Sequence, residues 1–493
     1  MGQDIEQIRF TREDRQQYRE KVKRCLEAMR VMLERGQFET GRRLLGVEME
    51  FYVVDTDGVP MMVNQALLDR IESEDFQTEL AQFNIEFNLA PHKIVGTVFR
   101  ELEEELLTSL GHAQRRAEEM DARVVMIGIL PTLEDLHVTI QNLSANPRYH
   151  LLNEMILQAR GEDLMINIEG VDKLATQTSS ITFEAAATSV QLHLQTDPDD
   201  FAAYWNAAQA VSAVQVAIGC NSPFFLGKEL WRETRIALFE QSIDTRPEEL
   251  AAQGVRPRVW FGEKWIDHLL DLFEENVRYF PALLPLTEPT ADPLEAVENG
   301  DVPRLEELKL HNGTIYRWNR PVYDVARGKP HIRVENRVLP AGPTIVDTMA
   351  NAAFYYGAVR ALAEADEPLH KQLSFYAAAE NFFTAAKQGI DSELFWPGVG
   401  EVPATELVLR KLLPMAHEGL TSWGVDRRDR DLYLGVIEQR CLKRQTGATW
   451  QAATFRRFFD GDGMDRHAAL INMTKHYIEH MSSNEPVHTW PSL

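Results

Sequence analysis

The sequence has few cysteines, and no two of them are spaced as in a metal site or a disulfide framework. Cys25, Cys220 and Cys441 lie far apart in the chain. This scarcity argues against a C-x-x-C zinc site and against a disulfide-stabilised fold, and it favours a cytoplasmic location. Long hydrophobic runs are also missing: the longest, near residues 211–219, is broken by Gln215. No membrane partner is therefore expected.

Positive charge is scarce as well. The 493 residues include 51 Lys and Arg against 75 Asp and Glu, which gives a formal charge of −24. This balance argues against nucleic acid as the principal partner, because a phosphate backbone requires a basic surface. ATP remains compatible, since bound cations and local arginines can reverse the sign of a site. The sequence contains no GxxxxGK[ST] motif, so a P-loop does not hold the phosphates.

The stretch 44–54, LLGVEMEFYVV, alternates apolar and polar side chains and predicts a strand with Glu48 and Glu50 on one face. Two carboxylates at this spacing lie about 6.7 Å apart and repel by about 2.5 kcal/mol at an effective dielectric near 20. Either water screens the pair or a cation joins it. For this stretch alone, a solvated sheet face is the simpler explanation.

Further segments repeat the alternation, and this repetition favours a cation site over a solvated sheet face. Polar-faced strands are predicted in three further regions: the second half of 79–91 with Glu86, 187–196 with Gln191 and His193, and 331–339 with Arg333, Glu335 and Arg337. Residues 164–171 form another alternating strand, whose Asn167 and Glu169 fit a solvated face equally well. Strands are expected only before about residue 340, and helices from residue 344 onward. Because helices do not regularly separate the strands, an α+β fold is favoured over a doubly wound parallel sheet.

If these strands belong to one sheet, their carboxylates converge. Such a cluster is costly without counter-charge, and divalent cations supply it. Oxygen ligands with a single imidazole suit Mg²⁺ or Mn²⁺. A site of this kind can hold the phosphates of ATP, while arginines neutralise a transferred phosphoryl group or bind a carboxylate.

Several motifs, in their order, resemble the glutamate–cysteine ligase type 2, or carboxylate–amine ligase, family. They are GVEMEF (46–51), Glu79 and Glu86 before NLAP, TSVQLHLQ (188–195), NSPFFLG (221–227) and RVENRVLPAGPTIVD (333–347), with a fainter match at GATWQ (447–451). The resemblance implies a fold like the catalytic domain of glutamine synthetase: an antiparallel sheet, backed by helices, with the active site on its concave face. It also implies ATP-dependent amide formation through a γ-glutamyl phosphate, which an amine then attacks.

The resemblance also assigns residues. It places six side chains at cation-ligand positions: Glu48, Glu50, Glu79, Glu86, His193 and Glu335. Arg337 and Arg235 match arginines expected at the phosphate or the substrate carboxylate and, with Glu335, form the expected catalytic set. Arg320 and Gln191 are expected beside the nucleotide. The implied substrates are glutamate and a cysteine-like amine, with ATP and Mg²⁺ or Mn²⁺ as cofactors.

Some interpretations stay open. Glu79 could equally be a solvated helix-end carboxylate, and Arg232 competes with Arg235. Where the family has Gly-Thr-His-Pro, this chain reads GILP (128–131), and this departure, with the additional helical segments, leaves a non-catalytic nucleotide or metabolite sensor as an alternative. A metal-assisted amide hydrolase on the same scaffold is a third, weaker alternative. A homo-oligomer is also left open.

Three segments are expected along the chain. They are an amphipathic helical segment (1–40), a catalytic sheet region (41–345) and a helical C-terminal region packed on the same domain (346–493).

Overall fold

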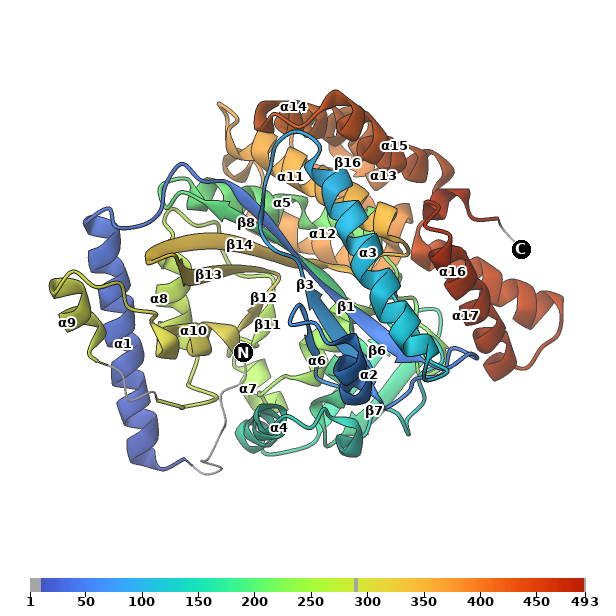
Figure 1. Ribbon diagram of the computed structural model, residues 1–493, viewed down its shortest axis with the longest axis horizontal. Coiled ribbons are helices and arrows are strands. Elements are labelled where there is room, and N and C mark those ends of the chain that lie inside the picture. The colour runs from blue at the N-terminus through green and yellow to red at the C-terminus, as the bar shows by residue number, and fades with distance from the viewer. Residues whose placement is uncertain (1–9, 288–290, 492–493) are drawn as a thin grey trace.

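A curled antiparallel sheet runs through the centre of the molecule (Figure 1). The computed structural model describes residues 10–287 and 291–491, so residues 1–9 of the predicted N-terminal segment lie outside it. The strand order is β13-β14-β8-β1-β3-β2, with β4 and β5 paired to β1. The strand bounds are β1 Leu44–Val54, β2 Phe76–Thr78, β3 Asn84–Asn88, β4 His92–Lys93, β5 Arg123–Val125, β8 Ser189–Thr196, β13 Asn319–Ala326 and β14 Lys329–Pro340.

Other strands form small two-stranded sheets outside the central one: β6 Leu164–Glu169 with β7 Lys173–Thr178, β9 Phe224–Phe225 with β10 Lys228–Glu229, β11 Val259–Trp260 with β12 Tyr316–Arg317, and β15 Glu393–Trp396 with β16 Gly400–Pro403. The strand predicted at 164–171 thus exists but does not join the site. The expectation that strands end near residue 340 is wrong. The β15–β16 hairpin buries Leu394 and Trp396, and the Asn381 amide on α12 bonds the Phe395 backbone.

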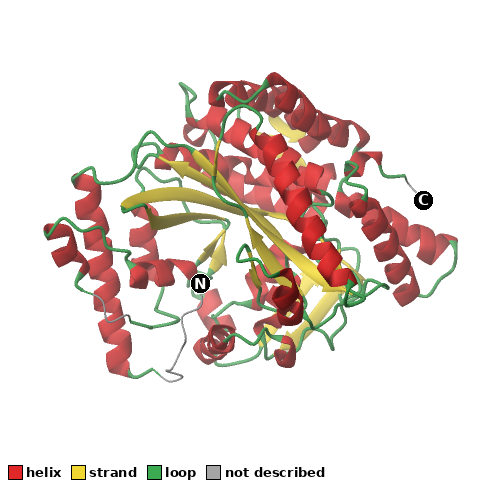
Figure 2. Ribbon diagram, viewed as in Figure 1, coloured by secondary structure: helices red, strands yellow, loops and turns green. Residues whose placement is uncertain are grey.

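Helices cover the apolar face of the sheet and surround its edges (Figure 2). Their bounds are α1 Arg12–Glu34, α2 Asn64–Ile71, α3 Val98–Glu118, α4 Pro147–Arg160, α5 Phe201–Gly219, α6 Thr234–Ser242, α7 Glu248–Ala252, α8 Leu270–Tyr279, α9 Pro293–Glu298, α10 Glu306–Gly313, α11 Ile345–Ala363, α12 Phe375–Gln388, α13 Ala404–Leu407, α14 Leu413–Trp423, α15 Arg427–Lys443, α16 Gly447–Arg456 and α17 Arg466–Ser482. Within the described ranges, no helix combines the length and hydrophobicity needed to cross a membrane.

The alternation along β1 separates its two faces. Val47 and Met49 are almost completely buried, and helices α5 and α11 pack behind the neighbouring strands. A buried amide chain also fixes the sheet to α5: Gln215 donates to Asn336 on β14 (3.0 Å), and Asn336 donates to Asn319 on β13 (2.7 Å). Because these amides are buried and paired, they set the position of both strands against the helix. The opposite face of the sheet is left free to carry polar side chains.

Helices α11 and α14 approach each other through glycines, which yields a stability prediction. A Cβ on Gly419 would lie 1.9 Å from the carbonyl oxygen of Gly357, whereas a Cβ on Gly435 of α15 would meet no atom within 4 Å. We expect Gly419→Ala to destabilise the protein by about 1–3 kcal/mol, since the helices must separate. Gly435→Ala is the matched control and should leave stability unchanged or slightly higher. Urea unfolding measures both, and equal midpoints would contradict this view of the interface.

Candidate active site

The sheet register brings the predicted polar residues to one surface. Between adjacent strands, the paired positions are Glu48 with Gln191, Glu50 with Glu86, His193 with Glu335, and Glu335 with Arg320. Five strands contribute to this surface, and it includes residues as far apart in the sequence as Glu48 and Glu335, which are more than 280 positions apart. The convergence expected from the alternation is present in the structure.

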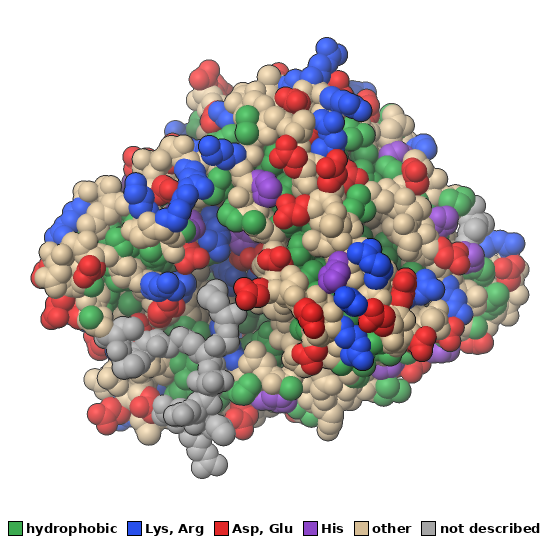
Figure 3. Space-filling model, viewed as in Figure 1, with side chains coloured by type: hydrophobic (Ala, Val, Ile, Leu, Met, Phe, Trp, Pro, Cys, Tyr) green, Lys and Arg blue, Asp and Glu red, His purple; other side chains and the backbone are tan. Residues whose placement is uncertain are grey.

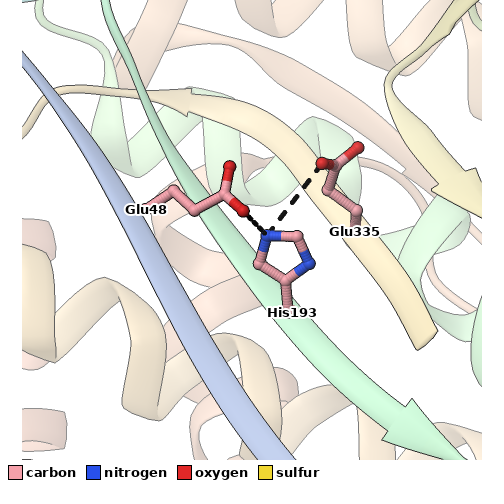
Figure 4. Close-up of side chains that lie close together, drawn as sticks. All are labelled: Glu48, His193 and Glu335. Carbon is pink, nitrogen blue, oxygen red and sulfur yellow. Dashed lines mark ion pairs between the residues drawn. The ribbon is translucent and has the colours of Figure 1, made fainter. Parts of the chain in front are cut away.

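Glu48, His193 and Glu335 point toward one another from β1, β8 and β14 (Figure 4). The His193 Nε2 atom lies 2.9 Å from a Glu48 oxygen and 4.0 Å from a Glu335 oxygen. The three candidate ligand atoms all lie within 4.8 Å of one another. His193 is 5% exposed and Glu335 is 2% exposed, so little water reaches them. Two carboxylate oxygens and one imidazole nitrogen in this arrangement fit a single divalent cation.

Arg333 orients the imidazole, and the sequence analysis gave it no role in the site. Its Nε donates to His193 Nδ1 (3.0 Å), and its Nη1 lies 3.2 Å from the His331 Nε2 atom. Because Nδ1 accepts this bond, the proton of a neutral His193 lies on Nε2, facing Glu48. A cation that binds at Nε2 must displace this proton.

Glu335 is held between two arginines. Arg320 makes two hydrogen bonds to it, at 2.5 and 2.9 Å, and an Nη1 atom of Arg337 lies 3.5 Å from it. Burial opposes ionisation, but the charges of Arg320 and Arg337 outweigh it and hold the pKa of Glu335 below its usual range. Arg320, expected beside the nucleotide, thus neutralises a carboxylate in this state of the site.

A second acidic group surrounds an adjoining cavity of about 190 Å³. Glu50 and Glu86 come from β1 and β3, while Glu79 follows β2 and turns toward the same space. Burial, together with the neighbouring carboxylates, raises the pKa of Glu79 and raises that of Glu86 to about 7. Glu79 is therefore a lining residue of the cavity and does not lie at the end of a helix, while its role as a cation ligand stays a prediction.

Glu184 is a lining residue that the sequence analysis missed. It lies on a 3₁₀ turn, Ile181–Ala186, so neither strand nor helix periodicity in the sequence predicts its position. Burial and the charge of Glu50 raise the pKa of its carboxyl to about 8. The cavity therefore holds five carboxylates, Glu48, Glu50, Glu79, Glu86 and Glu184, facing three arginines, Arg235, Arg320 and Arg337.

Arg337 reaches this cavity from β14, where a bulge follows Asn336. It donates to the Gln191 side chain, and Gln191 in turn donates to Glu50 (3.1 Å). Arg235 supports the bulge, because its guanidinium donates to the carbonyl oxygen of Val338 (2.5 Å) and to Glu233 (3.3 Å). Arg232 pairs with Glu229 (3.1 Å) instead of lining the cavity. Of the two competing arginines, the structure places Arg235 in the site.

Two larger cavities adjoin the first, and all three share Glu48. One of about 430 Å³ extends past His193 to Arg327 and Arg333, and the other, of about 440 Å³, extends past Arg320 to Lys309. Figure 3 shows a hollow near the middle of one face, with Lys and Arg side chains visible inside it. Basic side chains beside an acidic cluster suit a polyphosphate whose charge is shared between arginines and cations.

The donor set therefore fits divalent cations at two adjacent places. Glu48, His193 and Glu335 would hold one. Glu50, Glu79 and Glu86 would surround another. Burial raises the pKa of all three, repulsion by neighbouring carboxylates adds to it at Glu79 and Glu86, and a cation would favour their ionised forms. The chemistry that a bound cation supplies is charge neutralisation of phosphate oxygens.

The raised pKa of Glu86 gives a pH prediction for the metal-free protein. In the unfolded chain this carboxyl ionises near pH 4.5, whereas burial and Glu48 raise its folded pKa to about 7. The contribution of Glu86 to folding stability is therefore fully present below about pH 4.5 and is lost as pH rises through about 7. In EDTA we expect the melting temperature to fall by several degrees between about pH 6 and pH 8, and Mg²⁺ to reduce this fall.

Glu86→Gln should flatten that pH dependence, because the neutral amide has no proton to lose. Glu169→Gln, on the exposed face of β6, is the matched control and should melt like the unaltered protein at both pH values. A metal-free melting temperature that rises with pH would contradict the prediction.

Comparisons with known proteins identify the family of the chain. The sequence profile of glutamate–cysteine ligase family 2 matches residues 44–449. A Streptomyces coelicolor protein, provisionally named glutamate–cysteine ligase 2, is 23% identical over 427 residues, which cover 84% of this chain and 95% of that protein.

Two solved structures share the fold. Glutamate–cysteine ligase from Francisella tularensis, solved in complex with AMP, superposes with a TM-score of 0.52 at 13% identity and covers 92% of this chain and 96% of its own. A bifunctional glutathione synthetase from Pasteurella multocida gives a TM-score of 0.52 at 14% identity and covers 89% and 53%. The profile match spans most of the chain, so the protein belongs to glutamate–cysteine ligase family 2 and is an ATP-dependent ligase.

Proposed function

We propose that this protein joins the γ-carboxylate of glutamate to an amine, with ATP as the source of free energy and Mg²⁺ or Mn²⁺ as cofactor. The observation that carries the proposal is the Glu48–His193–Glu335 cluster with Arg337 and Arg320 beside it, on the sheet face where three cavities meet. Family membership and the AMP bound to the Francisella enzyme support the nucleotide. We also propose that the fold is of the glutamine synthetase catalytic type.

The reaction has two steps. A γ-carboxylate oxygen of glutamate attacks the γ-phosphorus of ATP, and the bond to the bridging oxygen breaks, so that ADP leaves with that electron pair. The nitrogen of the amine then attacks the acyl carbon, the C–O bond to phosphate breaks, and the nitrogen loses its extra protons to solvent. Phosphate is a good leaving group, so positioning and charge neutralisation suffice, and no strong general base is required.

The chain's own residues supply that positioning. Arg337 faces the small cavity and neutralises anionic oxygens there, while Gln191 fixes its guanidinium. Arg235 holds the bulge that presents Arg337. Arg320 pairs with Glu335 and lines both the small cavity and one of the larger ones. At this boundary it is suited to bind nucleotide phosphates that extend from the larger cavity toward the small one. The 190 Å³ cavity suits glutamate, whereas the two larger ones suit the nucleotide.

The proposal extends to the organisation of the chain. The segments 1–40, 41–345 and 346–493 would serve as a covering helix, the catalytic sheet region and a helical support. One contiguous hydrophobic core contains residues from all three of them. The partners are small molecules, glutamate and an amine, and assembly into a homo-oligomer is compatible with this arrangement.

The function is tested by incubating the protein with ATP, Mg²⁺, glutamate and a panel of amines that includes cysteine. We expect glutamate-dependent phosphate release and a γ-glutamyl amide identified by mass. Binding of ATP and Mg²⁺ without turnover by any amine would favour the sensor alternative. Amide cleavage without ATP would favour the hydrolase.

A further inference from the structure

A cavity of about 960 Å³, larger than the three that meet at Glu48, lies elsewhere in the molecule between α1 and α8. Helices α8 and α10 form the wall between it and the active site. Phe273 and Asn312 of these helices line the 440 Å³ active-site cavity, whereas Glu275 and His311 line the larger one. The proposed reaction uses none of the residues in this second space.

The carboxylates that line the cavity have partners, whereas three of its cations have none among the described residues. Its four carboxylates all have partners: Glu263 bonds Arg256 (2.7 Å), Asp271 accepts from two backbone N–H groups, Glu274 bonds Arg30 (2.7 Å) and Glu275 bonds Arg317 (2.7 Å). Three cations that line it, Arg19, Lys264 and Arg278, have no hydrogen-bond or ion-pair partner among residues 10–287 and 291–491. The cavity therefore has unneutralised positive charge and favours an anion.

His311, which lines this cavity, carries a buried acceptor without a partner in the described part of the chain. His311 is only 4% exposed, and its Nε2 bonds the carbonyl oxygen of Asn276 (3.0 Å), so Nε2 carries the proton. Its Nδ1 has no hydrogen-bond partner among the described residues. A buried acceptor without a partner costs about 1–3 kcal/mol. The Nδ1 atom is shielded from solvent, so an N–H or O–H group of a ligand would remove this cost only after the neighbouring side chains shift to uncover it.

Lys23, Arg30 and Arg256 also line the cavity, each paired with a carboxylate, and the rest of the lining is apolar or aromatic. Val22 and Leu26 of α1 face Val277 and Phe280 across the space. Next to them, the Arg256 guanidinium lies 3.5 Å from the ring centroid of Tyr279, so this arginine is engaged by the ring and by Glu263. Apolar walls, unneutralised cations and one buried acceptor together describe an amphipathic ligand.

We propose that this cavity is a binding site for an organic anion that carries an apolar ring system and an N–H or O–H donor. The anionic group lies among Arg19, Lys264 and Arg278, and the rings pack between α1 and α8. The donor bonds His311 Nδ1 once the lining side chains have shifted to uncover that atom. The ligand would touch the wall shared with the active site: Asn276, which accepts from His311, also donates to Asn312 (2.7 Å), and Asn312 donates to Pro321, next to Arg320 (2.7 Å).

The site can be tested with 2-anilinonaphthalene-6-sulfonate, a fluorescent anion that has both a ring system and an N–H donor. We expect saturable binding to the full chain, weakened about tenfold or more by Lys264→Glu with Arg278→Glu, since two exposed cations become repulsive. Lys411→Glu, which alters an exposed cation on the π-helical turn Val408–Leu412 before α14, is the control and should leave the dissociation constant unchanged. A dissociation constant unaffected by the double variant, or no saturable binding, would overturn the proposal.

A second probe tests His311 without altering the protein. The N-methyl derivative of the same dye keeps the sulfonate and the rings but has no N–H group. We expect it to bind about five- to tenfold more weakly, because Nδ1 is left unpaired. Equal affinity of the two dyes would overturn the assignment of the donor to His311. None of these measurements depends on ligase turnover, so they can fail independently of the proposed function.

Discussion

Glu48→Gln should abolish glutamate-dependent phosphate release and weaken Mn²⁺ binding by about 100-fold or more. Among residues 10–287 and 291–491, Glu48 alone lines all three active-site cavities, and it lies 2.9 Å from the His193 Nε2 atom. The amide has almost the same shape but lacks the negative charge that a cation requires. Mn²⁺ binding followed by electron paramagnetic resonance, together with phosphate release, measures the two effects separately.

The control for this experiment is Glu169→Gln, which removes a carboxylate from another alternating strand. Glu169 lies on the exposed side of the β6–β7 hairpin, away from the central sheet. We expect that variant to bind Mn²⁺ and turn over like the unaltered protein. If Glu48→Gln also did so, the polar face of β1 would be an ordinary solvated surface, and the proposed cation site would be wrong.

The contrast between these two glutamates shows how far sequence patterns reach. Alternation identified the strands that carry Glu48, Glu86, His193 and Glu335, and also the strand that carries Glu169. The pattern specifies which side chains share a face, because the side-chain period is two, but it does not specify which strands pair. Only the motif order, read as a family resemblance, separated the strands of the site from the β6–β7 hairpin.

Strand β13 was missed for a different reason. It begins NRPV, and a proline within a short run argues against a central strand. The structure resolves this because β13 lies at the edge of the sheet, where an absent N–H is tolerated. The consequence for the site is direct: Arg320 was expected at the nucleotide from a motif, whereas pairing of β13 with β14 puts it opposite Glu335.

The periodicity of a sequence does not predict which side chains form hydrogen bonds with each other. Arg333 was placed on the polar face of its strand, yet nothing in the sequence showed that it would donate to His193. Glu184 belongs to a 3₁₀ turn, and its approach to the cavity depends on how η2, Ile181–Ala186, folds against α6. Such residues can be found only once the backbone is in place.

Arg337→Gln should have the second largest effect, on both activity and stability. The guanidinium faces Glu335 at 3.5 Å and bonds Gln191, and it lowers the pKa values of Glu50 and Glu184 against the effect of burial. Removing one partner of a buried charge pair costs about 3–5 kcal/mol. We expect activity to fall about 1,000-fold, since positively charged donors at the site of phosphoryl and acyl transfer are lost.

The pH dependence of that variant separates charge loss from misfolding. Without Arg337 the nearby carboxyls have higher folded pKa values, so their contribution to stability is lost as pH rises, and the deficit should grow from about pH 5 to pH 8. Arg337→Lys restores a charge but not the planar fork, so it should recover more stability than activity. Arg232→Gln, which removes a cation paired with Glu229 outside the cavity, is the matched control. Denaturant unfolding at several pH values measures the stability of each variant, and phosphate release measures its activity. If the stability deficit of Arg337→Gln did not depend on pH, and if Arg337→Lys had full activity, Arg337 would act as a simple point charge away from the reacting groups.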